Sequence, residues 1–186
     1  MNNCKLSNVT QIYLKRFYEI LDEMIHGMTE AELTNSISHN FIAQMLPHHM
    51  AAIEMSKNIL KYTTCIPLQN IAEGIIKDQT KSIENMKSAL CECSELTNPE
   101  CNLRRYTAET DRIMKAMFER MRNAPELNDV NSSFIREMIP HHIGAIEMSL
   151  SALKYDICPE LVPILDKIIS SQKRGVDQMR RLLRFT

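Results

Sequence analysis

Hydrophobic residues recur every three or four positions through most of the chain, a pattern typical of amphipathic α-helices. Proline, glycine and short polar clusters interrupt it at intervals. We expect capping residues between Ser38 and Asn40 for the second helix, and at Asn131 or Ser132 for the fifth. The pattern predicts a linker over residues 94–102 and six helices, over about residues 10–28, 38–62, 68–91, 103–122, 131–155 and 160–183.

The order of these helices repeats with an offset of 93 residues. Residues 41–62 and 134–155 are identical at 14 of 22 positions without a gap, more than helix propensity alone would produce. We therefore predict one helical domain, residues 1–186, built by duplication of about 9–93 and 102–186. Each half should give two helices to an antiparallel four-helix bundle. One extra helix before them should pack against the bundle or bridge to a second copy of the chain.

The duplicated segment contains a proline followed by two histidines, Pro47-His48-His49 in the first copy and Pro140-His141-His142 in the second. On a helical wheel both imidazoles of a pair share one buried stripe with the neighbouring methionines. Glu54 and its counterpart Glu147 fall on the opposite face, so we expect them to be solvated or to bridge helices. We expect no carboxylate on the histidine face. The internal prolines predict a kink just before each pair.

Methionine is the unusual residue of this chain, at 13 of 186 positions. Ten of the methionines form five pairs at the offset of 93, whereas ordinary core packing would accept leucine or isoleucine at many of these positions. Thioether and imidazole ligands together favour soft ions, Cu(I) or Ag(I). The candidate ligands are His48, His49, Met45, Met55 and Met86 with their counterparts His141, His142, Met138, Met148 and Met179, and Met24, Met28, Met117 and Met121 form an additional candidate set.

A glutamine also repeats within an apolar stripe, as Gln79 and Gln172. A buried amide needs a partner, because leaving it unsatisfied costs about 1–3 kcal/mol. An imidazole N–H of the facing histidine pair would serve, and the bond would present the other ring nitrogen to a metal ion. We therefore predict that the two glutamines orient the histidines.

Charge and targeting signals limit the partners and the compartment. The formal net charge of −1 gives no argument for binding nucleic acid, and no stretch approaches the roughly 18 apolar residues of a membrane span. The N-terminal segment lacks a signal-peptide pattern, so we predict a cytoplasmic protein with no membrane partner.

In a reducing compartment the six cysteines are expected to be free thiols or soft-metal ligands rather than a disulfide framework. Cys91, Cys93 and Cys101 could form a thiolate site, although exposed free thiols are the favoured reading. Cys65 and Cys158 occupy equivalent positions in the two repeats, and we expect small buried hydrophobic side chains there.

Each histidine motif reads Met-(Leu/Ile)-Pro-His-His-x-(Ala/Gly)-Ala-Ile-Glu-Met and precedes a helix with Gln-x-x-x-(Ile/Val)-x-x-Met. Over residues 38–91 and 131–184 this resembles the bacterial "domain of unknown function 305" family. The resemblance implies a ferritin-like bundle of two helical hairpins and a role in copper or silver binding and tolerance. It marks both histidine pairs with Met55, Met86 and their counterparts.

The chain departs from the family pattern in two respects. Many members are secreted, whereas this chain shows no export signal. Members often have an acidic residue three positions after the glutamine, where this chain has Ser82 and Gly175. No carboxylate ligand is therefore carried over from the resemblance.

The sequence as a whole predicts an all-α, ferritin-like bundle that binds Cu(I) or Ag(I) for buffering, storage or tolerance. A binding protein is favoured over an enzyme, and a homodimer is possible. One alternative is a ferritin-like di-metal oxidoreductase, although neither histidine motif has the Glu-x-x-His spacing of such centres. The other is a helical scaffold or interaction protein whose histidines belong only to the core.

Overall fold

The computed structural model describes residues 6–93 and 96–184, and within these ranges the chain is all-helical, without strands. The predicted helices are confirmed to within three residues at each end. Two residues of the predicted linker, 94 and 95, lie outside the described part, and the linker ends earlier than predicted, where α4 begins. The six helices are α1 (Asn8–Thr29), α2 (Ile37–Leu60), α3 (Ile66–Cys93), α4 (Glu100–Arg122), α5 (Val130–Ala152) and α6 (Val162–Leu182).

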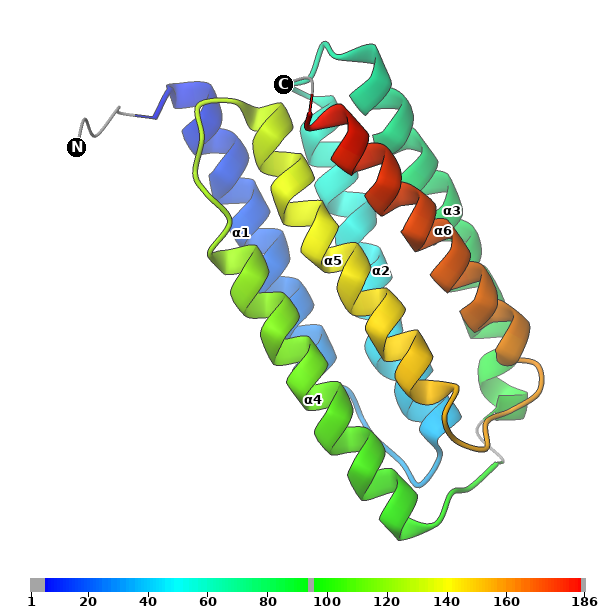
Figure 1. Ribbon diagram of the computed structural model, residues 1–186. Coiled ribbons are helices and arrows are strands. Elements are labelled where there is room, and N and C mark those ends of the chain that lie inside the picture. Colours follow the sequence, from blue (N-terminus) through cyan, green and yellow to red (C-terminus); the bar gives the residue numbers. More distant parts are fainter. Residues whose placement is uncertain (1–5, 94–95, 185–186) are drawn as a thin grey trace.

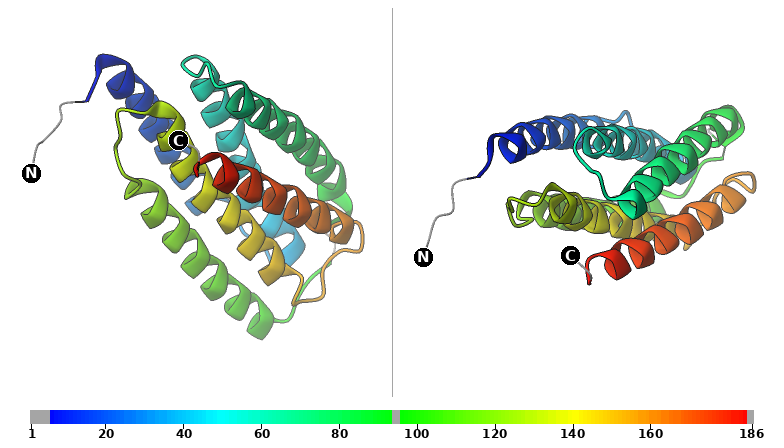
Figure 2. Two further views of the ribbon diagram at one scale, coloured as in Figure 1. Left: turned by 45° about the horizontal axis from the view of Figure 1, so that its top comes forward. Right: turned by 90° about the horizontal axis from the view of Figure 1, so that it is seen from above.

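The helices form two layers, one from each repeat (Figure 2). One layer contains α1, α2 and α3, and the other contains α4, α5 and α6. The layers meet where α2 packs on α5 and α3 packs on α6, and both pairs run antiparallel (Figure 1). These four helices make the predicted bundle, while α1 packs on α2 and α4 on α5. No described helix combines the length and the apolar character needed to cross a membrane.

The two motif helices begin slightly earlier than predicted because other residues cap them. Ser36 accepts a hydrogen bond from the backbone of His39 at the start of α2, and Asp129 caps α5 in the same way. The expected cap Ser38 instead accepts a hydrogen bond from the backbone N–H of Cys158, in the loop before α6. Ser38, which was predicted to cap the start of a helix, therefore connects the two repeats by a hydrogen bond.

Gly27 lies inside α1, near its end. A Cβ at this position would lie 2.8 Å from Cβ of Pro47, so α1 can approach the middle of α2 only with glycine here. Both α2 and α5 continue through their internal prolines as single helices. Neither proline therefore breaks its helix, and α1 covers α2 at Pro47, while the kink stays a prediction.

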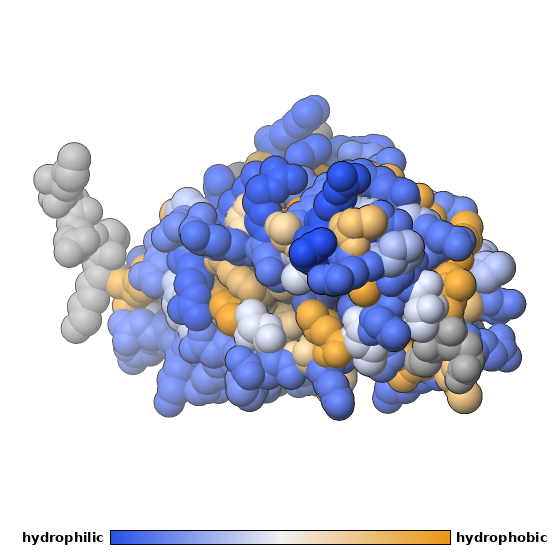
Figure 3. Space-filling model, turned by 90° about the horizontal axis from the view of Figure 1, so that it is seen from below, coloured by the Kyte–Doolittle hydropathy of each residue, from blue (hydrophilic) through white to orange (hydrophobic). Residues whose placement is uncertain are grey.

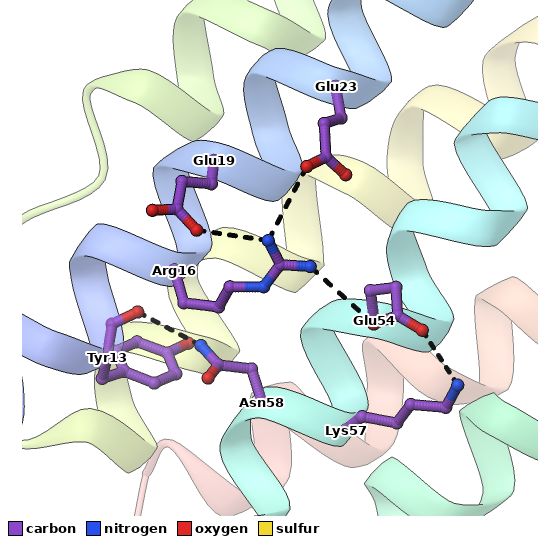
Figure 4. A network of polar contacts seen from close by, with 7 residues as sticks. All are labelled: Tyr13, Arg16, Glu19, Glu23, Glu54, Lys57 and Asn58. Carbon is purple, nitrogen blue, oxygen red and sulfur yellow. Dashed lines mark hydrogen bonds and ion pairs between the residues drawn. The ribbon is translucent and has the colours of Figure 1, made fainter.

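Glu54 on α2 bridges to Arg16 on α1, one of the two outcomes expected for it (Figure 4). Its carboxylate lies 2.8 Å from Nζ of Lys57 and 3.9 Å from the guanidinium of Arg16 on α1. Exposed ion pairs of this kind contribute little to stability. The buried amide of Asn58, which donates to the carbonyl of Tyr13, connects the same two helices out of contact with water.

The expectation of free thiols or soft-metal ligands, rather than disulfides, is wrong for two of the six cysteines. Cys93 at the end of α3 forms a disulfide with Cys158 in the loop before α6, across 65 residues of sequence. Cys91 and Cys101 are exposed and free, and Cys65 is half-buried. The three clustered cysteines therefore do not share a site, because the Cys93 side chain points inward while its neighbours face solvent. Figure 3 views this end of the molecule, whose surface is mostly hydrophilic.

Candidate metal centre

His48 and His141 meet at the centre of the bundle, where α2 crosses α5. Their ring centroids are 3.7 Å apart and the ring planes are tilted by 30°. Nε2 of each ring lies 3.2 Å from the backbone carbonyl oxygen of the other residue, so the two bonds are reciprocal. Duplicated helices that pack about a pseudo-twofold axis produce this pairing, because equivalent residues then face each other.

The reciprocal bonds fix which ring nitrogen of His48 and His141 carries a proton. A carbonyl oxygen can only accept a hydrogen bond, so Nε2 must be the donor and Nδ1 must have its lone pair free. Neither Nδ1 atom has a hydrogen-bond partner, although both rings are fully buried. The Nδ1 atoms of His48 and His141 are thus unprotonated and buried, and neither accepts a hydrogen bond.

All four motif histidines are at most 2% exposed, and burial lowers the pKa of each imidazole. The pKa of His49 falls to about 3 and that of His141 to about 4. For His48, the neighbouring imidazoles, His141 first, lower the pKa further. The rings are therefore neutral near pH 7, which is the form that binds metal ions.

The second histidine of each pair faces outward from the α2–α5 interface toward a different helix, and here the two repeats differ. Nε2 of His49 lies 3.0 Å from the hydroxyl of Ser82 on α3. The Cδ2–Nε2 edge of the His142 ring lies against Gly175 on α6, where a Cβ would come within 2.8–2.9 Å of the ring. The Met138 carbonyl one turn back raises the pKa of His142 slightly, but Nδ1 makes no hydrogen bond of good geometry.

The candidate methionines are all buried in one hydrophobic cluster with the bundle core. None is more than 2% exposed, whereas the unpaired Met50 is 57% exposed. On α4, the sulfur of Met117 occupies the space that a side chain at Gly144 would fill, two residues after the histidine pair of α5. The structure thus places the thioethers in the same interior as the imidazoles, from the outer helices as well as from the bundle. The ten are Met24, Met28, Met45, Met55, Met86, Met117, Met121, Met138, Met148 and Met179.

Comparison with known proteins agrees with this arrangement. The sequence profile of the family described as "Domain of unknown function (DUF305)" matches residues 22–90 and 38–183. The chain belongs to the DUF305 family. A crystal structure of a DUF305 fragment from Deinococcus radiodurans has a TM-score of 0.59 and 21% sequence identity to this chain, and covers 81% of this chain and 97% of the fragment.

A second solved relative is CopM in a silver-bound form obtained by soaking. It has a TM-score of 0.59 and 27% sequence identity, over 82% of this chain and 97% of that one. No curated protein sequence matches this DUF305 chain.

A buried glutamate and two buried glutamines in this DUF305 protein differ from what the sequence predicted. The expectation of no carboxylate on the histidine face is wrong, because Glu137 is 3% exposed and lies one turn before His141. It accepts a hydrogen bond of 2.6 Å from the Tyr13 hydroxyl, and burial raises its pKa to about 8. Its first-repeat counterpart is Gln44, so the offset of 93 already showed a polar residue at this helical position. Gln79 and Gln172 are buried as predicted, but Oε1 of neither makes the expected bond to a histidine.

Proposed function

We propose that this chain binds a soft monovalent metal ion, Cu(I) or Ag(I), inside the bundle and thereby buffers, stores or detoxifies it. The imidazoles of the two motifs are the nitrogen ligands, and methionines of the same core supply sulfur. A cytoplasmic location and a homodimer stay predictions of the sequence. The ligands are drawn from His48, His49, His141, His142, Met45, Met55, Met86, Met138, Met148 and Met179, with Met24, Met28, Met117 and Met121 as a further methionine set.

The unpartnered ring nitrogens carry this proposal. Nδ1 of all four motif histidines is buried without a hydrogen-bond partner. A buried polar atom left in this state costs about 1–3 kcal/mol, so the metal-free protein maintains the cluster at a considerable cost in stability. A cation bound to these lone pairs would remove the cost. Because the rings are neutral near pH 7, no proton has to be displaced first.

The surroundings favour a soft ion over a hard one. Among the described residues, the one group of three His, Cys, Asp or Glu side chains with ligand atoms within 4.8 Å of one another is Cys93, Cys158 and Glu160, which contains no histidine. One ion would therefore contact fewer than three of the imidazoles, and buried thioethers would have to complete its coordination, which favours a soft ion. The silver-bound form of CopM, at 27% identity, supports the same class of ion.

An anaerobic competition titration tests the proposal. Cu(I) is supplied as a complex with a chromophoric chelator, and its transfer to the protein is followed by absorbance. We expect transfer to the wild-type chain and about tenfold or greater weakening in the double variant His48→Gln, His141→Gln, since glutamine keeps an N–H donor but removes the imidazole. His26→Gln, which changes an exposed histidine, is the matched control. Wild-type affinity in the double variant would reject these ligands.

The thioethers are tested in the same assay. Met55→Leu should weaken binding because leucine fills similar volume without sulfur. Met50→Leu, at an exposed position of the same helix, should leave it unchanged. Equal affinities in both variants would exclude Met55 as a ligand.

A scaffold in which the histidines are only core residues predicts no effect of Ag(I) on stability. A bound ion at 100 times its Kd should instead stabilise the fold by about 2.7 kcal/mol, which raises the Tm of a chain this size by roughly 5–10 °C. For the alternative of a di-metal oxidoreductase, iron or manganese retained through anaerobic purification would be the supporting result.

A further inference from the structure

A polar cleft leads from the surface to one member of the histidine cluster. It lies between α3 and α6, has a volume of about 190 Å³, and His142 of α5 is among the residues that line it. This volume accommodates an ion with several waters. No other histidine of the two motifs lines this cleft.

Two buried amides line the same cleft, Gln79 from α3 and Gln172 from α6. Both are 3% exposed, and Oε1 of each has no hydrogen-bond partner. A half-turn of the amide exchanges its oxygen and nitrogen, so either residue can present a carbonyl oxygen to the cleft. The cleft thus contains unsatisfied polar atoms that a cation or its hydration water would complete.

The duplication shows why the cleft opens on this side. Gly74 and Gly175 line it, and the residues at the equivalent positions of the other repeat are Lys167 and Ser82. A Cβ at Gly74 would meet nothing within 4 Å, so this position faces open space. At Gly175 the missing side chain leaves the His142 ring edge uncovered, whereas Ser82 places its hydroxyl on His49. Two small residues therefore make the opening.

The charged residues at the rim of the cleft give it little net charge with which to attract or repel an ion. Asp78 and Arg174 line the cleft and lie 4.0 Å apart, each about half exposed, so their charges largely cancel. The remaining lining groups that matter are neutral amides and a neutral imidazole. Amide oxygens are weak ligands for a soft ion, which suits transient binding on the way to or from the His142 imidazole.

We propose that this cleft is the site through which Cu(I) or Ag(I) enters and leaves the buried cluster, with His142 and the amides of Gln79 and Gln172 as its first contacts. In the first repeat the bond between Ser82 and His49 closes the equivalent route. The inference rests on the proposed function. It adds that the ion enters and leaves faster past His142 of the second repeat than past His49 of the first, although the two motifs are nearly identical.

The test compares rates with affinities. Cu(I) is delivered anaerobically from a chromophoric chelator by stopped flow, and release is measured by an excess of a stronger chelator. Gly175→Ser installs the residue of the first repeat against the ring of His142. We expect it to slow loading and release together by about tenfold or more, while Kd changes less than about threefold, because the route is closed and the buried ligands are unchanged. Ser82→Gly added to this variant should restore fast loading through the other side.

A second variant guards against misfolding at Gly175. Gly74→Leu fills the mouth of the cleft from a position whose Cβ meets open space, and it should slow exchange in the same way. Lys167→Leu, which places leucine at the equivalent exposed position of the other repeat outside the cleft lining, is its matched control and should exchange at the wild-type rate. Wild-type rates in both Gly175→Ser and Gly74→Leu would overturn the inference, as would a faster release with weaker Kd. If the wild-type chain takes up no Cu(I) at equilibrium, the proposed function itself fails, which is a separate result.

Discussion

Acid should destabilise the metal-free protein because its buried imidazoles would have to take up protons. An unfolded histidine has a pKa near 6.5, whereas burial lowers the pKa of His49 to about 3 and that of His141 to about 4. Between these values the unfolded state binds more protons than the folded state. The contribution of these rings to stability is therefore complete above about pH 6.5 and is lost as the pH falls toward the folded pKa.

The size of the effect follows from these values. Each of the two histidines should lower the free energy of unfolding by about 2 kcal/mol between pH 7 and pH 5, or about 4 kcal/mol together. The pKa values of His48 and His142 are lowered by burial in the same direction and add to the loss. Glu137 opposes it. Its folded pKa of about 8 keeps a proton that the unfolded carboxyl has released, so the same pH change stabilises the fold by about 2–3 kcal/mol.

Urea unfolding followed by circular dichroism at pH 5, 6 and 7 measures this balance in metal-free protein. In a Glu137→Gln background the opposing group is absent, and we expect the free energy of unfolding to fall by about 4 kcal/mol or more from pH 7 to pH 5. Adding His49→Gln and His141→Gln should remove about 4 kcal/mol of that dependence. A free energy that stays level across this pH range in the Glu137→Gln protein would refute the description of the histidines as buried and neutral.

Three further predictions concern stability. Cys93→Ser should lower the free energy of unfolding by about 4 kcal/mol, the value expected for a disulfide that closes a loop of 65 residues. In urea titrations, a reducing agent should lower the free energy of unfolding of the wild-type protein but not that of the variant. As the pH rises from 5 to 9, the free energy of unfolding of the Glu137→Gln variant should increase by about 4 kcal/mol relative to that of the wild type, because the buried wild-type carboxyl must ionise over that range. Equal pH profiles of the two proteins in urea unfolding would contradict this. Gly144→Ala should lower stability by about 1–3 kcal/mol, since the new Cβ would lie 2.2 Å from Sδ of Met117, whereas Gly74→Ala, which meets open space, should not lower the Tm measured by calorimetry.

Local patterns along the chain determined most of the fold. The three- and four-residue spacing of apolar side chains defines which face of each helix is buried, and this requires no knowledge of the partner helix. The same spacing placed His48, His49 and the paired methionines inside. The offset of 93 also makes His48 and His141 equivalent residues, and the two rings meet where the motif helices cross.

The packing of one helical layer on the other determines which side chains become partners, and the sequence alone did not predict these pairs. The partner of Cys93 is 65 residues away, and nothing in the spacing of the cysteines identifies it. The burial of Glu137 depends on Tyr13 of α1, which reaches across the repeats to bond it. In each case the partner is set by how rigid helices dock, because a small rotation of a helix about its axis brings a different side chain to the interface.

The difference between the two repeats likewise appears only in three dimensions. Ser82 and Gly175 are visible in the sequence as a departure from the duplicated pattern, but their meaning depends on which ring each one faces. A helical wheel gives the direction of a histidine around its own axis, not the identity of the residue across the interface. The sequence by itself therefore determined that four histidines are buried, and the tertiary structure decided that His142 is the one of these four that lines the cleft between α3 and α6.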